Sequence, residues 1–232
     1  MISLKKLNTI ASILIFFFLL LYTVIALGQN NQETQYLLSG KNIKISGFGG
    51  PTLSFSQITN EPAVLTGGGG AVLFNQTFFA GIFGEGLSSD HRLKQLQMEN
   101  DFGNISTFYD VRTDFGYGGL WLGYIHQPKN AVHFGLSTKI GWGSISLAER
   151  DYHIDWHDNI MNDVVFVFNP QAEIELNLYR WFKLNIGVGY RFVSGLDKTY
   201  VNQLGQEKKY FQNTDFSQPH ATIGLLFGGF GK

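Results

Sequence analysis

The sequence has 232 residues, with 17 basic and 18 acidic side chains, six histidines and no cysteine. This near-neutral balance excludes the concentrated basic face that nucleic-acid binding requires. The lack of cysteine excludes disulfides, so stability must come from burial and hydrogen bonding. The 21 Phe, 10 Tyr and 28 Gly beside only five Pro are typical of β structure.

The N-terminus predicts a signal peptide. Lys5 and Lys6 precede an unbroken apolar run over 10–26, and the small residues Ala26 and Gly28 suit a signal-peptidase site. The alternative is an uncleaved anchor helix, since the run is close to the lower length limit for a membrane span. No cysteine follows the site, so a lipid cannot be attached there. We therefore expect three parts: a cleaved signal peptide (1–28), a short N-terminal segment (29–41) and one domain (42–232).

From there on, apolar residues alternate with small or polar ones. In the stretch Val132–Trp142, the even positions are apolar except for Thr138, while the odd ones carry His, Gly, Ser and Lys. Such period-two alternation predicts strands with two different faces. We expect eight: 42–56, 62–75, 77–86, 108–126, 131–145, 163–178, 181–194 and 217–231.

The connections alternate between tight turns and long polar stretches. Turns are expected at 75–76, 127–130 and 179–181, with long loops over 87–107, 146–162 and 195–216 and a shorter polar stretch near 57–61. An even number of strands with short turns at one end and long loops at the other is typical of transmembrane β-barrels. The sequence therefore predicts an all-β, eight-stranded antiparallel transmembrane barrel with short periplasmic turns and long extracellular loops.

A soluble lipocalin-like barrel is the main structural alternative. Such a barrel buries its apolar side chains and exposes its charges. Here one face of each strand is almost purely apolar, while the other mixes glycine with charged residues, which suits lipid outside and a narrow polar interior. Aromatic residues support a membrane position by gathering at two levels. Tyr124, Phe134, Tyr179, Trp181 and Phe230 lie near the short turns, and Trp142, Phe166 and Phe192 lie nearer the long loops.

Four consecutive glycines, Gly67–Gly70, need a separate explanation. A phosphate-binding loop would continue with Lys and Ser or Thr and then a helix, whereas AVLFNQT follows here. A flexible linker is excluded because the run lies within a predicted strand pair. We interpret these glycines as positions where the strands bend and where large inward side chains need space.

Charged residues on the inward faces predict an interior network, and opposite charges in near balance predict a barrel closed to solutes. Glu85 belongs to this group only if its face is inward, which the pattern leaves open. Glu175 and Lys183 should lie diagonally across neighbouring strands. The expected network comprises Lys44, Arg112, Asp114, Lys139, Glu173, Glu175, Lys183 and Arg191.

The faces also predict register. We expect Leu178 opposite Phe182 across a three-residue turn, and Ile125 opposite Val132 across the next turn, because a slip of one would turn charged residues into lipid. Pro170 cannot donate to a ladder, so either a bulge or an irregular outer part of the strand is expected near Asn169.

The chain resembles the small outer-membrane β-barrels, the OmpA transmembrane domain and OmpX, and more closely the barrels common in Bacteroidota, including PorT-like proteins. The resemblance covers 42–232 and rests on IKISGFGGPTLSFS, on the hairpin FGYGGLWLGYI…VHFGLSTKIGWG and on the closing TIGLLFGGFGK. It implies a last strand that serves as an assembly signal, with matching residues at Thr222, Gly224, Phe227 and Phe230. The sequence departs from that signal by continuing to Gly231 and Lys232 and by aromatic spacing that is off by one.

One loop suggests chemistry. In RDYHIDWHDN, an extended backbone would place His153, Asp155 and His157 on one face, as metal ligands are placed. Asp155 and His157 also resemble the Asp-x-His pair of omptin proteases, although those barrels are larger, with ten strands. The His-x-Ser arrangement of barrel lipid A deacylases is missing.

Two functions therefore stay open. The first is a monomeric, non-enzymatic barrel that needs no cofactor, with outer-membrane lipid and the barrel assembly machinery as its partners. It would contribute to envelope structure or display its loops to an unknown partner. The alternative is an outer-membrane hydrolase, acting on lipid or peptide, or a metal site in the loop around His153.

Overall fold

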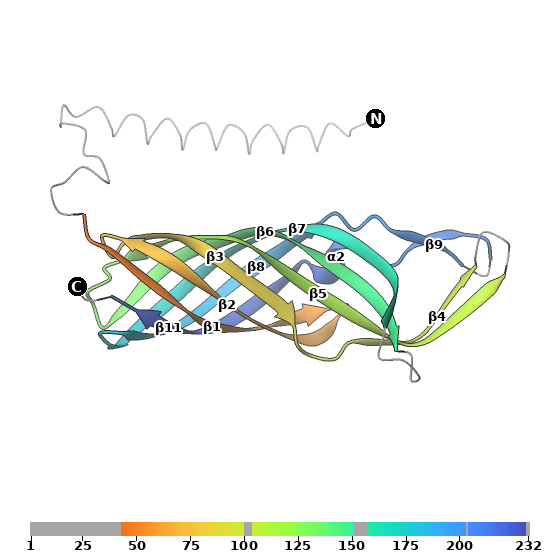
Figure 1. Cartoon of the computed structure of the whole chain (residues 1–232), viewed down its shortest axis with the longest axis horizontal. Coiled ribbons are helices and arrows are strands. Elements are labelled where there is room, and N and C mark those ends of the chain that lie inside the picture. Colours follow the sequence, from red (N-terminus) through yellow and green to blue (C-terminus); the bar gives the residue numbers. More distant parts are fainter. Residues whose placement is uncertain (1–42, 100–103, 151–156, 203, 231–232) are drawn as a thin grey trace, which may run out of the picture. The chain divides into compact units, whose positions relative to one another are not determined.

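The computed structural model describes residues 43–99, 104–150, 157–202 and 204–230. Eight long antiparallel strands form a closed barrel, because each pairs with the next along the wall and the first also pairs with the last. The predicted fold is confirmed (Figure 1). The strands are β1 (Ile45–Ile58), β2 (Glu61–Phe74), β3 (Phe78–Leu87), β5 (Ile105–His126), β6 (Val132–Arg150), β7 (His157–Tyr179), β8 (Phe182–Ser194) and β11 (Gln218–Gly228).

The wall is apolar outside and polar inside, which reverses the usual order of a soluble barrel. On β6, the outward Phe134 and Trp142 have 62% and 63% of their surface exposed, while the inward Lys139 is 3% exposed. Side chains alternate across a strand, so this contrast repeats along the wall. No helix within the described ranges is long and apolar enough to cross a membrane.

Tight turns join the strands at both ends. Asn75 and Gln76 both have positive φ (51° and 61°), and so do Thr59 and Asn60 (50° and 64°) at the opposite end. Two successive residues of this kind match the twist of a hairpin. The polar stretch expected near 57–61 is thus a two-residue turn. We call the end with Asn75 the short-turn end and the other the loop end.

The predicted register between β7 and β8 holds from Asn177 into the wall, where Asn177 faces Lys183 and further pairs follow the same register. The turn differs, because Tyr179 pairs with Phe182 and the register shifts at Leu178. A two-residue turn and one extra, unpaired residue together shift the strands as much as the expected three-residue turn would. The residues of β7 and β8 beyond the turn therefore point to the predicted faces.

The register predicted between β5 and β6 is wrong. His126 pairs with Phe134 and Ile125 with Gly135, so Ile125 does not face Val132. Ile125 points inward and is 1% exposed. On this part of β5 the inward residues Trp121 and Ile125 are themselves apolar, so an apolar residue there does not indicate a lipid-facing position.

The bulge expected near Asn169 is also absent between β7 and β8. Phe168 pairs with Phe192 and Gln171 with Gly189, which is one unbroken register on both sides of Pro170. Between these two pairs, the ladder lacks its pairs at Asn169 and Pro170, because proline has no N–H to donate. The wall accommodates this proline through missing pairs rather than an extra residue.

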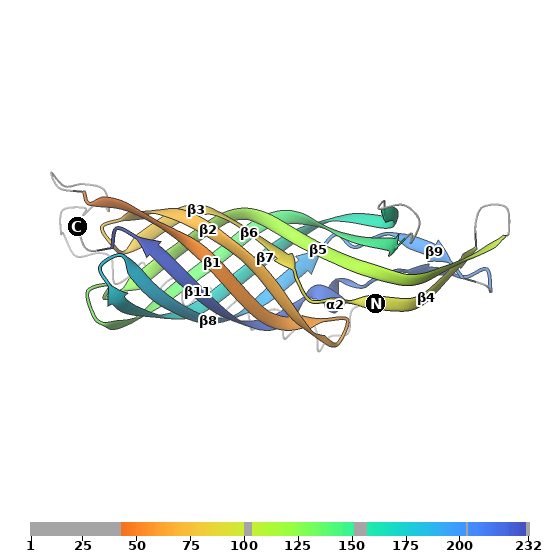
Figure 2. The same cartoon turned by 60° about the horizontal axis from the view of Figure 1, so that its bottom comes forward.

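The stretches expected as long loops contain further strands. β6 and β7 continue their ladder to the pair Arg150–His157. β4 (Arg92–Glu99) pairs with the first part of β5, β9 (Thr199–Val201) joins β4, and β10 (Glu207–Lys209) joins β9. This loop-end sheet, in the order β10–β9–β4–β5, extends past the barrel wall (Figures 1 and 2). The short helix α2 (Asn213–Phe216) precedes β11.

The glycines of β2 make room for large inward side chains. A Cβ on Gly67 would overlap the carbonyl oxygen of Gly84 and come within 2.8 Å of the Glu85 Cα. A Cβ on Gly69 would meet the ring of Trp121 at 3.1 Å. Neither phosphate binding nor flexibility is needed to explain the run.

We predict that Gly67→Ala lowers the free energy of unfolding by about 1–3 kcal/mol, because the new methyl group meets backbone that cannot move aside. Gly84→Ala is the matched control, since a Cβ there has no neighbour within 4 Å. Urea unfolding in detergent micelles, followed by tryptophan fluorescence, measures both. Equal effects of the two substitutions would contradict this explanation of the glycine run.

Candidate functional site

A cluster of three ionisable side chains lies inside the barrel near the short-turn end. Lys183 Nζ lies 2.9 Å from Glu175 Oε2, and His133 Nε2 lies 2.9 Å from the same oxygen. His133 Nδ1 is 3.1 Å from the carbonyl oxygen of Asn130, which fixes the ring. All three side chains are buried, with 2% or less of each side chain exposed. β6, β7 and β8 place them together because they are consecutive neighbours in the wall.

Glu173 lies on the same face of β7, two residues before Glu175. Ser137 donates to Oε1 at 2.5 Å, and the Asn185 amide donates to Oε2 at 3.0 Å. No ion pair of Glu173 occurs in the part of the chain that the structure describes. Neutral donors therefore satisfy this buried carboxyl group, and hydrogen bonding takes the place of a counter-ion.

A second ion pair joins Glu85 of β3 to Lys139 of β6 across the interior. The Tyr117 hydroxyl donates to Glu85 Oε2 at 2.7 Å and accepts a weak contact from the Asn169 amide at 3.4 Å. Both charged side chains are at most 3% exposed. Because both charges are buried, each must be stabilised by the other and by the hydrogen bond from Tyr117.

Arg191 occupies the interior towards the loop end and is 1% exposed. Its Nε donates to the carbonyl oxygen of Phe216 at 3.0 Å, and a terminal nitrogen contacts Ser56 Oγ at 3.3 Å. The guanidinium carbon lies 5.2 Å from the centre of the Phe115 ring. Carbonyl oxygens and an aromatic face therefore surround this cation, and it connects β8, α2 and β1.

Apolar side chains close the interior at both ends. Towards the loop end, Phe216 of α2 is fully buried and packs against Phe115 and Phe211 at ring distances of 5.3 and 5.2 Å. At the short-turn end, edge-to-face contacts of 5.1 to 5.5 Å join three rings. These rings belong to Phe48, Phe79 and Trp121. Aromatic rings thus lie at both ends of the charged interior.

The structure places most of the predicted interior charges inside the barrel, but not all. Lys139, Glu173, Glu175, Lys183 and Arg191 are buried there. Arg112 and Asp114 are a correction: they pair with each other at 2.9 Å, with 45% and 44% of their side chains exposed. Even-numbered residues of β5, such as Leu120 and Leu122, point outward. The sequence prediction assigned the two faces of β5 the wrong way round at Ile125, and it therefore placed Arg112 and Asp114 inside.

Lys44 is the other correction. It precedes β1 and is exposed at the rim of the short-turn end, with its backbone N–H donating to Asn75 Oδ1 at 3.1 Å. Lys44 has the alternation of the inward residues of β1, such as Phe48, but it lies before the strand begins, so its side chain does not enter the interior. Alternation alone does not show where a strand ends.

Several members of the network were missed or left open. Glu85 lies inside, a position that the alternation around the glycines did not decide. His133 shares the face of Lys139, and Asn185 shares that of Lys183, so period two was a sufficient signal for both. Tyr117 gave no signal, because an aromatic residue on a strand suits either face.

The four residues expected to form an assembly signal divide between the two faces. Thr222 is buried, and the Gly224 position faces Asn185 and Thr52 inside. Phe227 points outward and stacks on Phe182 at 5.1 Å. Phe230 instead folds back inside, with Lys183 Nζ 4.4 Å from its ring centre. A role in assembly stays a prediction.

The metal ligands predicted around His153 lie largely outside the part of the chain that the structure describes. His153 and Asp155 lie outside the described residues, and for His157 only the backbone at the start of β7 is described. Across the described ranges, no group of three or more His, Cys, Asp or Glu side chains could hold a metal ion. A metal or hydrolase site in this loop therefore stays a prediction.

Comparison with known proteins returns small outer-membrane barrels among the solved structures. The N-terminal β-barrel domain of Pseudomonas aeruginosa OprF has 11% identity and a TM-score of 0.44, over 81% of this chain and 99% of that one. Neisserial surface protein A has 6% identity and a TM-score of 0.48, over 82% and 100%. Ail of Yersinia pestis has 13% and 0.37, over 79% and 95%. No family model matches the sequence, and no curated protein matches it significantly.

We predict that Lys183→Met lowers the free energy of unfolding by about 3–5 kcal/mol, because it leaves the buried Glu175 carboxylate without its cation. The double variant Glu175→Leu, Lys183→Met should recover part of that loss, since it removes both charges. Lys198→Met, at an exposed lysine, is the control. The unfolding midpoint in detergent measures all three. A double variant no more stable than Lys183→Met would show that the pair is not coupled.

Proposed function

We propose that the protein is a non-enzymatic β-barrel of the bacterial outer membrane. Its interior serves stability, and its loop-end sheet serves contact with a partner. The observation that supports this proposal best is that the barrel is polar inside and apolar outside: three glutamates, two lysines and an arginine are buried inside, while the outer wall is apolar. An apolar outer wall is stable in the hydrocarbon core of a membrane.

Aromatic side chains support the membrane position. Near the short-turn end, Tyr179 and Trp181 stack at 5.9 Å on the outer face, both largely exposed. Nearer the loop end, Trp142 packs on Phe166 at 5.5 Å, and Phe168 stacks on Phe192 at 6.1 Å. Two belts on one outer surface fit the two interfaces of a bilayer.

The closed interior argues against transport. Glu85, Glu175 and Glu173 are satisfied by ion pairs or neutral donors inside the wall. Eight strands enclose little more than the width that side chains fill, and aromatic layers cover both ends of this network. A single closed wall has no unpaired edge within the barrel, which favours a monomer.

The loop-end sheet is the part that favours contact with a partner. On this sheet Ile105 and Val201 expose 53% and 37% of their surface, and Leu204, in the turn between β9 and β10, exposes 79%. Arg92 of β4 pairs with Asp110 of β5 at 2.5 Å and with Asp90, just before β4, at 2.7 Å. Its hydrogen bond to Asp90 lowers the pKa of that carboxyl group. Exposed apolar residues on an ordered sheet are typical of an interaction surface.

We expect the purified protein to show no steady conductance in a planar lipid bilayer, because neither end of the interior is open. A general porin in the same bilayer is the positive control. Heat-dependent mobility on a gel should show that the reconstituted barrel is folded. Stable open-channel currents from the folded protein would contradict a closed interior.

We also expect the loop end to face the outside of the cell. An epitope inserted beside Gly205, where φ is +68° and nothing crowds the residue, should be labelled on intact cells. An epitope added after Lys232 should be labelled only after the envelope is opened. The reverse pattern would contradict this orientation.

A further inference from the structure

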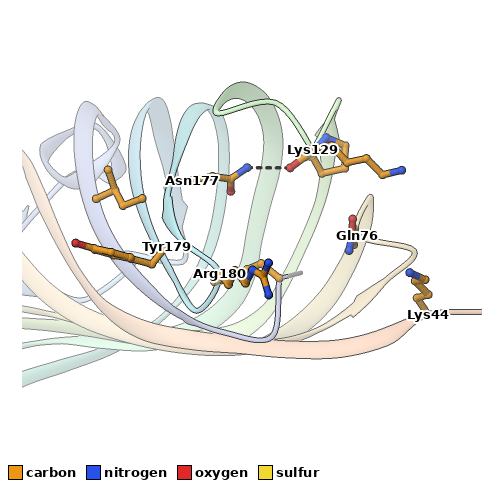
Figure 3. A pocket seen from close by; sticks show the side chains of 9 residues that line it. Lys44, Gln76, Lys129, Asn177, Tyr179 and Arg180 are labelled. Atoms are coloured by element: carbon orange, nitrogen blue, oxygen red, sulfur yellow. Dashed lines mark hydrogen bonds between the residues drawn. The ribbon is translucent and has the colours of Figure 1, made fainter. Parts of the chain in front are cut away.

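An open basin lies at the short-turn end, outside the sealed interior. It has a volume of about 640 Å³ and is bordered by the turns β2–β3, β5–β6 and β7–β8 and by the start of β1 (Figure 3). Three cations line it: Lys44, Lys129 and Arg180. They come from three separate segments, so the fold gathers them although the sequence does not.

Among the described residues, no acid balances these cations locally. None of the three forms an ion pair with a described residue. The described residues of the short-turn end include no Asp or Glu apart from Glu175, which is buried inside with Lys183. Three like charges around one hollow repel one another and attract an anion.

The basin is held in shape by hydrogen bonds. The Asn177 amide donates to the carbonyl oxygens of Pro128 and Asn130 at 3.0 and 2.7 Å, and the Asn177 N–H donates to Ala131 at 2.8 Å. These bonds fix the β5–β6 turn, which carries Lys129, to the end of β7. The floor is partly apolar, because Phe230 also lines the hollow.

The position of the basin on the barrel indicates what kind of anion could bind there. Its border includes Leu178 and Tyr179, which are 48% and 66% exposed on the outer wall. Arg180 stands between Tyr179 and Trp181, the stacked pair of the aromatic belt. The hollow therefore opens beside the level where lipid headgroups meet a barrel.

We propose that this basin binds the phosphate group of an anionic phospholipid from the adjoining leaflet. Lys44, Lys129 and Arg180 contact the headgroup, and Leu178 and Tyr179 border the start of its acyl chains. The proposal rests on the membrane position proposed above. It does not depend on which leaflet the short-turn end meets.

Native mass spectrometry of the folded protein in detergent, titrated with phosphatidylglycerol, tests the proposal. Lys44→Gln, Lys129→Gln and Arg180→Gln together should weaken binding about a hundredfold, at roughly fivefold for each charge. The matched control is Lys94→Gln, Lys198→Gln and Lys208→Gln, which removes three exposed cations at the loop end and should leave binding unchanged. Zwitterionic phosphatidylcholine should bind more weakly than phosphatidylglycerol.

Equal binding by the basin variant and the parent protein would overturn the proposal, as would equal affinity for the two lipids. Glycerol phosphate separates the two sources of a phosphate group. If it competes at the same concentration as the lipid, the basin takes a soluble anion and the lipid assignment is wrong. Because conductance and cell-surface labelling are measured separately, failure here is distinguishable from failure of the proposed function.

Discussion

Closing eight strands into a barrel leaves an interior only as wide as the side chains that fill it. Every inward position must therefore be matched in size and charge with the positions across from it. Gly67 and Gly69 lack side chains where Glu85 and Trp121 need the space. The glycine content of the sequence and the arrangement of its buried charges follow from the same lack of room.

Narrowness also determines how the charges are satisfied. A buried ion is costly unless its partner is close and its remaining hydrogen bonds are made. The barrel meets this requirement in three ways: the Glu175–Lys183 and Glu85–Lys139 pairs, neutral donors around Glu173, and carbonyl oxygens with an aromatic face around Arg191. Each solution uses residues from at least two strands, so the interior polar groups hold the wall in register.

Much of this could be predicted from the sequence, because period two is a strong signal where one face is apolar and the other is not. This pattern correctly predicted which residues of β6, β7 and β8 face the interior, and it predicted that Glu175 lies close to Lys183. It failed on β5, where Ile125 and Trp121 form an apolar floor inside and both faces look alike. Arg112 and Asp114 were misplaced for that reason.

The loop end was hidden for a different reason. Beyond the wall, polar residues are frequent in β4, β9 and the outer parts of β6 and β7, and only a few apolar side chains such as Leu96, Leu147 and Met161 are buried. Ladder hydrogen bonds do not depend on side-chain polarity, and the strands continue where the pattern has ended. The basin was equally hidden, because Lys44, Lys129 and Arg180 are far apart in the chain and meet only when the start of β1 and two turns come together in the fold.

Arg191 has a consequence for the order of assembly. It sits on β8 yet reaches Ser56 and Gln57 of β1, while β11 lies between those two strands in the wall. Its contact with Ser56 spans 135 residues of sequence. Contacts of such separation form late, since the loop between them must close first. The β1–β2 hairpin joins strands that are neighbours in the chain, whereas the Arg191 contacts require β1, β8 and α2 to have met across the seam. Arg191 can therefore make these contacts only when the barrel has closed, so we expect its burial to come late in folding.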